Sequence, residues 1–108
     1  MIDDADDVAI AAITVAELKV GIQMAKGRRK EGRERFVAAV LDAVSVEVYD
    51  LDVADAHAAL LAHVRRAGTP RGAHDLIIAA TARARERQVM TLDQTGFADL
   101  PGVSVSSD

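Results

Sequence analysis

Three acidic residues in separate segments are the candidates for chemistry in this sequence. Glu17 follows a short apolar run, Asp75 begins an alanine-rich stretch, and Asp93 ends a second apolar run. Carboxylate oxygens are the hard ligands that Mg²⁺ and Mn²⁺ prefer, and such an ion lowers the pKa of a bound water toward that of a usable nucleophile. Brought together, the three carboxylates would therefore suit metal-dependent hydrolysis of a phosphodiester.

Each acid also has an ordinary structural explanation. Glu17 lies three residues after Thr14, which is the spacing of a capping box at the start of a helix. Asp75 could be a first-turn residue stabilised by the helix dipole, and Asp93 could be a turn residue. Taken singly, these explanations are as good as a catalytic one, so the case for a site depends on all three acids lying together.

Strand and helix patterns alternate along the chain, which predicts an α/β fold with a mainly parallel sheet covered on both faces. Ligands bind such folds beyond the carboxyl ends of the strands, and the three acids fall at those positions. The breaker cluster at 68–72 separates the last two long helices, residues 27–30 form a basic connection, and a helical turn is expected near 97–100. The expected strands cover 8–13, 46–51, 88–92 and 103–105, and the expected helices cover 14–27, 31–43, 52–67 and 75–85.

Composition narrows the class of protein. With 108 residues, 50% of them apolar and only 3% aromatic, the chain has the length of one domain with an aliphatic core. The absence of cysteine excludes disulfides, thiolate zinc sites and a cysteine nucleophile. No apolar stretch is long enough to span a membrane, and the acidic start is unlike a secretory signal. A soluble, cytoplasmic protein is therefore expected.

The basic residues and histidines offer fewer clues. The net charge of −4 argues against indiscriminate binding to nucleic acid. The basic residues fall into two groups, which are either solvated helix faces or contacts to an RNA backbone. His74 could orient Asp75 or simply start a helix. His57 and His63 are six residues apart, on different helix faces, so we expect them to be surface or partly packed residues rather than a metal pair. The basic groups are Arg28, Arg29, Lys30, Arg33 and Arg35, and Arg65, Arg66 and Arg71.

Three motifs, taken in order, resemble the PIN-domain ribonucleases of the VapC toxin type, which are the toxin halves of bacterial toxin–antitoxin pairs. The first is AITVAELKVG at 12–21, with Glu17, and the second is PRGAHDLIIAATA at 70–82, with Asp75. The third is VMTLD at 89–93, with Asp93, followed by GFADLPGV at 96–103. The second motif is the most specific, and the resemblance extends from residue 10 to residue 105.

The resemblance implies a three-layer α/β/α fold and an Mg²⁺-dependent endoribonuclease that hydrolyses RNA phosphodiesters with a metal-activated water. Glu17, Asp75 and Asp93 would form the acidic metal site, with Asp75 as the most direct ligand and Mn²⁺ as an alternative ion. Thr91 would support the site, and Asp99 matches a further acid of the family or caps a turn. The resemblance also implies a homodimer and a small cognate antitoxin that presents a basic residue to the acids.

The chain departs from the family at its start. Family members begin with a strand that carries an aspartate ligand, and the acids at 3–7 precede what corresponds to the second strand. We therefore expect a single PIN-like domain over 1–108 that is truncated at its N-terminus. A fragment, a late start of the reading frame and strand exchange between chains are all open explanations.

Two other functions compete with the nuclease. A catalytically impaired PIN module could only dimerise or bind antitoxin, because one main ligand has no counterpart here. A doubly wound nucleotide-binding or signalling domain is the weaker alternative, since no glycine-rich phosphate loop follows the first expected strand.

Overall fold

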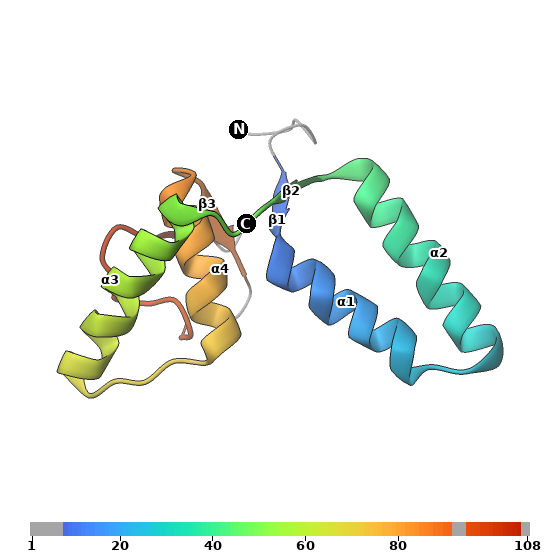
Figure 1. The fold of residues 1–108 in the computed structure, drawn as a ribbon, viewed down its shortest axis with the longest axis horizontal. Helices are drawn as coiled ribbons and strands as arrows, with labels where there is room; N and C mark the ends of the chain where they lie inside the picture. The colour runs from blue at the N-terminus through green and yellow to red at the C-terminus, as the bar shows by residue number, and fades with distance from the viewer. Residues whose placement is uncertain (1–7, 92–94, 107–108) are drawn as a thin grey trace. The chain divides into compact units, whose positions relative to one another are not determined.

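The computed structural model describes residues 8–91 and 95–106, which belong to two compact units, Met1–Glu47 and Val48–Asp108. We refer to them as the N-terminal unit and the C-terminal unit and describe each by itself (Figure 1). No helix among the described residues is long and apolar enough to cross a membrane. The elements are β1 (Ala9–Ala11), α1 (Ala12–Met24), α2 (Gly27–Ala43), β2 (Ser45–Glu47), α3 (Leu51–Ala67), α4 (Ala73–Ala84), β3 (Gln88–Met90) and β4 (Ser104–Ser106).

In the N-terminal unit, two helices connect two short parallel strands. β1 pairs with β2 in parallel, with Ile10 opposite Val46, and α1 contacts α2. Lysine, arginine, glutamate and alanine dominate α2, and these residues favour a helix without needing burial. Of this composition α2 buries only Val37, and α1 buries no residue.

The C-terminal unit contains a well-packed core. Figure 1 shows α3 and α4 side by side, and they contact each other more extensively than any other pair of elements. On α3 the buried side chains recur every three or four residues, so they form one apolar stripe. β3 pairs in parallel with β4, with Val89 opposite Val105. The core consists of Val53, Ala56, Leu60, Val64, Leu76, Ala79, Ala80, Ala82, Val89, Phe97 and Leu100.

Asp50 connects the beginning of α3 to the end of α4. As the N-cap of α3, its Oδ1 accepts a hydrogen bond from the Val53 N–H at 3.1 Å. Arg85, which follows α4, forms an ion pair with Asp50 at 3.0 Å and donates to the Val48 carbonyl at 3.0 Å. Two contacts hold the pKa of the Asp50 carboxyl below its ordinary value of 3.8. The hydrogen bond from the Val53 N–H has the largest single effect on this pKa, followed by the Arg85 guanidinium.

The prediction of an α/β fold with parallel strands is confirmed, but several boundaries were wrong. α1 begins at Ala12, and its N-cap Ala11 provides no side-chain cap. Thr14 and Glu17 therefore lie inside the helix, and the expected capping box does not form the helix start. A short apolar run cannot by itself be divided between a buried strand and a helix, and here only three of its residues form the strand.

Two other local predictions were also wrong. Residues 27–30 form the first turn of α2 rather than a connection, because their arginines and lysine are good helix formers. Residues 95–99 form turns and no helix. The first three strands are shorter than expected, with three paired residues each, and β4 has the expected length but lies one residue later. Among the described residues the strands form two separate two-stranded sheets, β1–β2 and β3–β4.

Candidate active site

Asp75 lies in the first turn of α4, where a carboxylate is favoured. Gly72 is the N-cap of this helix and provides no side-chain cap, and Asp75 is the third residue after it. The backbone N–H groups of a first helical turn lack helical partners and carry a partial positive charge. The partly buried Asp75 carboxyl therefore lies where a negative charge is stabilised, as the sequence predicted.

Two glycines closely approach the Asp75 carboxyl. A Cβ atom on Gly96 would lie 2.9 Å from Asp75 Oδ2 and 3.6 Å from its Cγ, and one on Gly72 would lie 3.4 Å from the same Oδ2. Real Cβ atoms essentially never come within 3.0 Å of another heavy atom, so the carboxyl occupies space that a side chain at position 96 would need. The sequence analysis missed this role of Gly96, although the residue stands in the third motif.

Arg71 connects the segment before α4 to the segment that contains Gly96. Its Nη1 donates to the Thr69 carbonyl at 2.8 Å, and its Nη2 donates to the Ala98 carbonyl at 2.9 Å. Phe97 and Leu100, on the same segment as Ala98, are buried in the core. The two segments next to Asp75 are therefore joined to each other by Arg71, and the one that contains Gly96 is anchored in the core by Phe97 and Leu100.

The other two predicted acids are placed differently. Glu17 is an exposed residue of α1 and belongs to the N-terminal unit. Asp93 lies outside the described residues. Within 8–91 and 95–106, no three potential ligands among histidine, cysteine, aspartate and glutamate come together. The metal site made of Glu17, Asp75 and Asp93 therefore stays a prediction.

The weaker candidates from the sequence lie in a turn, beside a strand or on helices. Asp99 is exposed, with a φ of 61°, in the left-handed region that aspartate tolerates in turns. The Thr91 backbone N–H donates to the Ser106 carbonyl just beyond β3. His57 and His63 are partly buried, as expected, and a 2.8 Å hydrogen bond joins His57 Nδ1 to the Tyr49 hydroxyl. His74 is exposed.

Sequence comparison finds a similar protein among the known ribonucleases. The chain is 38% identical over 92 residues to the VapC ribonuclease Y4jK of Sinorhizobium fredii, and the match covers 82% of this chain and 66% of the relative. The chain therefore spans about two thirds of the length of this relative.

Two solved structures of toxin–antitoxin proteins have a similar fold. The VapBC-5 structure from Mycobacterium tuberculosis, a member of the VapBC family of toxin–antitoxin systems, is 35% identical with a TM-score of 0.77, and the match covers 92% of this chain and 79% of that one. The FitAcB structure from Neisseria gonorrhoeae is 32% identical with a TM-score of 0.83, and the match covers 94% of this chain and 76% of that one. These likenesses confirm the PIN-like α/β fold.

The match to a family covers both units. The sequence model of the PIN domain matches residues 1–103, which include all three predicted acids. This match confirms the resemblance found in the three motifs, and the chain belongs to the PIN domain family.

Proposed function

We propose that this chain is a metal-dependent endoribonuclease of the VapC type, the toxin of a toxin–antitoxin pair that acts in the cytoplasm. The observation that carries the proposal is the match of the PIN domain model to residues 1–103, a range that includes Glu17, Asp75 and Asp93. It is supported by the 38% identity to a protein named as a VapC ribonuclease and by the close approach of Gly72 and Gly96 to the Asp75 carboxyl.

The chemistry of the donor set suits a hard divalent ion. Glu17, Asp75 and Asp93 would supply carboxylate oxygens, which are the ligands of Mg²⁺ and Mn²⁺. When bound, such an ion would neutralise charge on the RNA phosphate and make a water molecule acidic enough to attack it.

The residues around Asp75 would orient it. Gly72 and Gly96 leave room for the carboxyl and restrict where its oxygens lie. Arg71 holds the two flanking segments together through the carbonyls of Thr69 and Ala98. Because oriented ligands lose little freedom when they bind, such a restriction favours a defined site over a mobile carboxylate.

We also propose a small antitoxin protein as the partner of this chain and a homodimer as its assembly. The antitoxin is supported by the solved relative at 35% identity, which is a member of the VapBC family of toxin–antitoxin systems. The homodimer is implied by the family resemblance, and light scattering of the purified chain would test it.

The test of the nuclease is cleavage of a mixed small-RNA pool by the full chain with Mg²⁺, Mn²⁺ or EDTA. Two variants accompany the wild type, Asp75→Asn and the matched control Asp55→Asn, which changes an exposed acid of α3. We expect metal-dependent cleavage that disappears in Asp75→Asn and persists in Asp55→Asn, with both variants folded by circular dichroism.

Calorimetric titration with Mn²⁺ separates the nuclease from the non-catalytic alternative. Saturable binding that weakens in Asp75→Asn and not in Asp55→Asn would support the metal site. Cleavage that survives in Asp75→Asn would contradict the role of Asp75. A folded wild-type chain with neither cleavage nor saturable Mn²⁺ binding would favour a module that only dimerises or binds antitoxin.

A further inference from the structure

A pocket of about 280 Å³ lies in the C-terminal unit, between the end of α3, the segment before α4 and the first turn of α4. Its apolar surface is formed by Leu61, Val64, Pro70 and Leu76. Ligand pockets in proteins begin at about 300 Å³, and this pocket lies at that lower limit. It therefore has room for one compact group and not for a long segment of a ligand.

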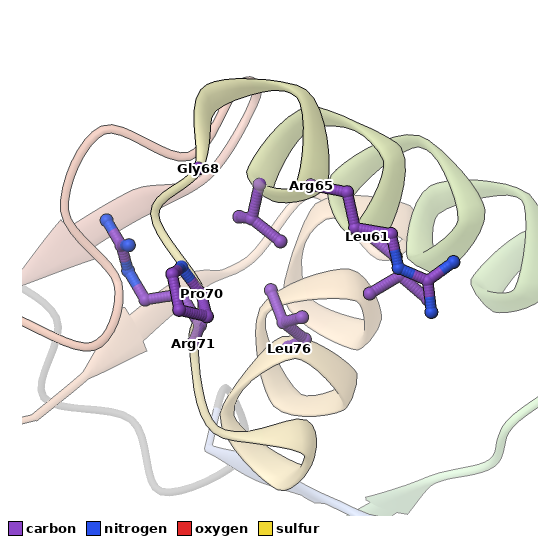
Figure 2. A pocket seen from close by; sticks show the side chains of 7 residues that line it. Leu61, Arg65, Gly68, Pro70, Arg71 and Leu76 are labelled. Carbon is purple, nitrogen blue, oxygen red and sulfur yellow. The ribbon is translucent and has the colours of Figure 1, made fainter.

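Two arginines flank the apolar surface. Figure 2 shows the side chains of Arg65 and Arg71 on opposite sides of the pocket, with Pro70 and Leu76 between them. Arg65 is exposed in the last turn of α3. The Nε of Arg71 is buried and has no hydrogen-bond partner among the described residues. A ligand in the pocket does not reach this buried atom, so the pocket combines an apolar surface with one exposed cation, Arg65.

The pocket adjoins the candidate active site along the chain. Leu76, which lines the pocket, directly follows Asp75, and Arg71 directly precedes Gly72, which closely approaches the Asp75 carboxyl. The pocket and the Asp75 carboxyl therefore share the segment that runs from Arg71 to Leu76.

We infer that this pocket is a nucleotide subsite, which binds one base of the RNA strand beside the phosphodiester held at Asp75. A nucleotide has apolar ring faces, acceptor atoms at the ring edge and an anionic phosphate. The apolar surface fits the ring, and Arg65 fits the phosphate. The inference rests on the proposed ribonuclease function, because it names the part of the substrate that this surface recognises.

An acidic peptide with one apolar side chain would satisfy a similar combination of surfaces. The nucleotide is favoured because the pocket shares the Arg71–Leu76 segment with Asp75, where the RNA phosphate has to lie. The test therefore includes the peptide as a competing ligand.

The experiment measures binding of 5′-mononucleotides to the full chain by NMR, without metal and without cleavage. The four probes are AMP, GMP, CMP and UMP, and adenosine and inorganic phosphate are added to separate the contributions of base and phosphate. The matched variants are Arg65→Ala and Arg66→Ala, because both residues are exposed in the last turn of α3 and only Arg65 lines the pocket. Thermal melts confirm that both variants are folded.

We expect saturable binding of at least one nucleotide, with shifts at the amides of Leu76 and Arg71. Its affinity should fall about tenfold in Arg65→Ala, the size of one lost charge-assisted contact, and change less than about twofold in Arg66→Ala. Adenosine and inorganic phosphate should each bind more weakly than AMP.

Three results would overturn the inference. The first is no nucleotide binding by the folded chain, and the second is an equal loss of affinity in both arginine variants. The third is Arg65-dependent binding of a short peptide with one leucine between two glutamates, while the nucleotides fail to bind. Nucleotide binding that depends on Arg65, in a chain that cleaves no RNA, would instead refute the nuclease proposal and leave the subsite standing.

Discussion

The two units differ in how much apolar surface they bury. In the N-terminal unit, α1 has no buried residue, α2 buries only Val37, and Phe36 is 61% exposed. In the C-terminal unit, α3 buries four residues and α4 buries five. Because apolar burial is the main favourable term in folding, the C-terminal unit should account for most of the stability of the chain.

The same difference affects the candidate acids. Asp75 closely approaches Gly96, on a segment whose Phe97 is buried in the core, so packing restricts where its carboxyl lies. Glu17 projects from a helix without buried residues. The comparison teaches that the C-terminal unit couples its packing to the position of Asp75, and that the helix carrying Glu17 contributes no residue to such a core.

The largest expected effect is on stability, at Leu60. This side chain has no exposed surface, so Leu60→Ala should leave a cavity and lower the free energy of unfolding by about 2–5 kcal/mol. Urea unfolding followed by circular dichroism measures this change. Leu51→Ala, on the same helix but 82% exposed, is the control and should change stability by less than about 0.5 kcal/mol. Equal losses of stability in Leu60→Ala and Leu51→Ala would contradict the assignment of Leu60 to the core of the C-terminal unit.

A smaller effect is expected at Gly96. In Gly96→Ala the new Cβ would lie 2.9 Å from Asp75 Oδ2, so the carboxyl must shift, and overpacking of this kind costs about 1–3 kcal/mol. We expect weaker Mn²⁺ binding together with lower stability. In an Asp75→Ala background the clash disappears, so Gly96→Ala should then cost little.

Gly32 of α2 provides the matched control for Gly96. A Cβ on Gly32 would meet nothing within 4 Å, so Gly32→Ala should raise the free energy of unfolding by up to about 1 kcal/mol, because alanine favours a helix over glycine. If Gly96→Ala cost the same in both Asp75 backgrounds, the close approach would not explain the effect.

A pH-dependent effect is expected at Asp50. Asp50→Ala removes the N-cap of α3 and the partner of Arg85, so Tm at pH 7 should fall by a few degrees. The folded state holds the pKa of Asp50 below its ordinary value of 3.8. The charged carboxyl therefore stabilises the fold at pH values above 3.8, and this contribution is lost as the pH falls through the lowered pKa.

Melting curves at a series of pH values test this sign. The difference in Tm between wild type and Asp50→Ala should be constant near neutral pH and shrink below about pH 4. A difference in Tm that grows on acidification would contradict the lowered pKa of Asp50. The control is Asp55→Asn, which leaves the helix cap and the ion pair of Asp50 intact and should show no such trend.

The smallest effect is expected at Phe36 in the N-terminal unit. Because this ring is mostly exposed, Phe36→Ser should change the free energy of unfolding of the isolated chain by less than about 0.5 kcal/mol. Urea unfolding at low protein concentration measures it. A loss comparable to that of Leu60→Ala would show that the ring is buried when the chain folds in solution.

Much of the fold could be predicted because it depends on local patterns. The spacing of Val53, Ala56, Leu60 and Val64 correctly indicated one face of a helix, and the breaker cluster before Asp75 correctly indicated a helix start. The boundary at Ala12 was wrong, because an apolar run satisfies both a buried strand and a helix until a pairing strand limits it.

The surroundings of Asp75 could not be predicted in the same way. The Arg71–Ala98 hydrogen bond joins residues 27 positions apart, and the Asp50–Arg85 ion pair joins residues 35 positions apart. The close approach of Gly96 to Asp75 is also distant in sequence. No local periodicity encodes such contacts, because they form only when α4 and the segment after β3 pack on the same core.

The sequence by itself therefore determined the class of this protein, since alternating patterns and three ordered motifs already indicated a parallel α/β fold of the PIN type with Asp75 at a helix start. The tertiary structure alone decided that Gly96 closely approaches the Asp75 carboxyl, that Arg71 connects the flanking segments and that an apolar pocket adjoins them. The physical reason is range: helix and strand preferences act over a few neighbouring residues, whereas side-chain packing brings together residues that the chain keeps far apart.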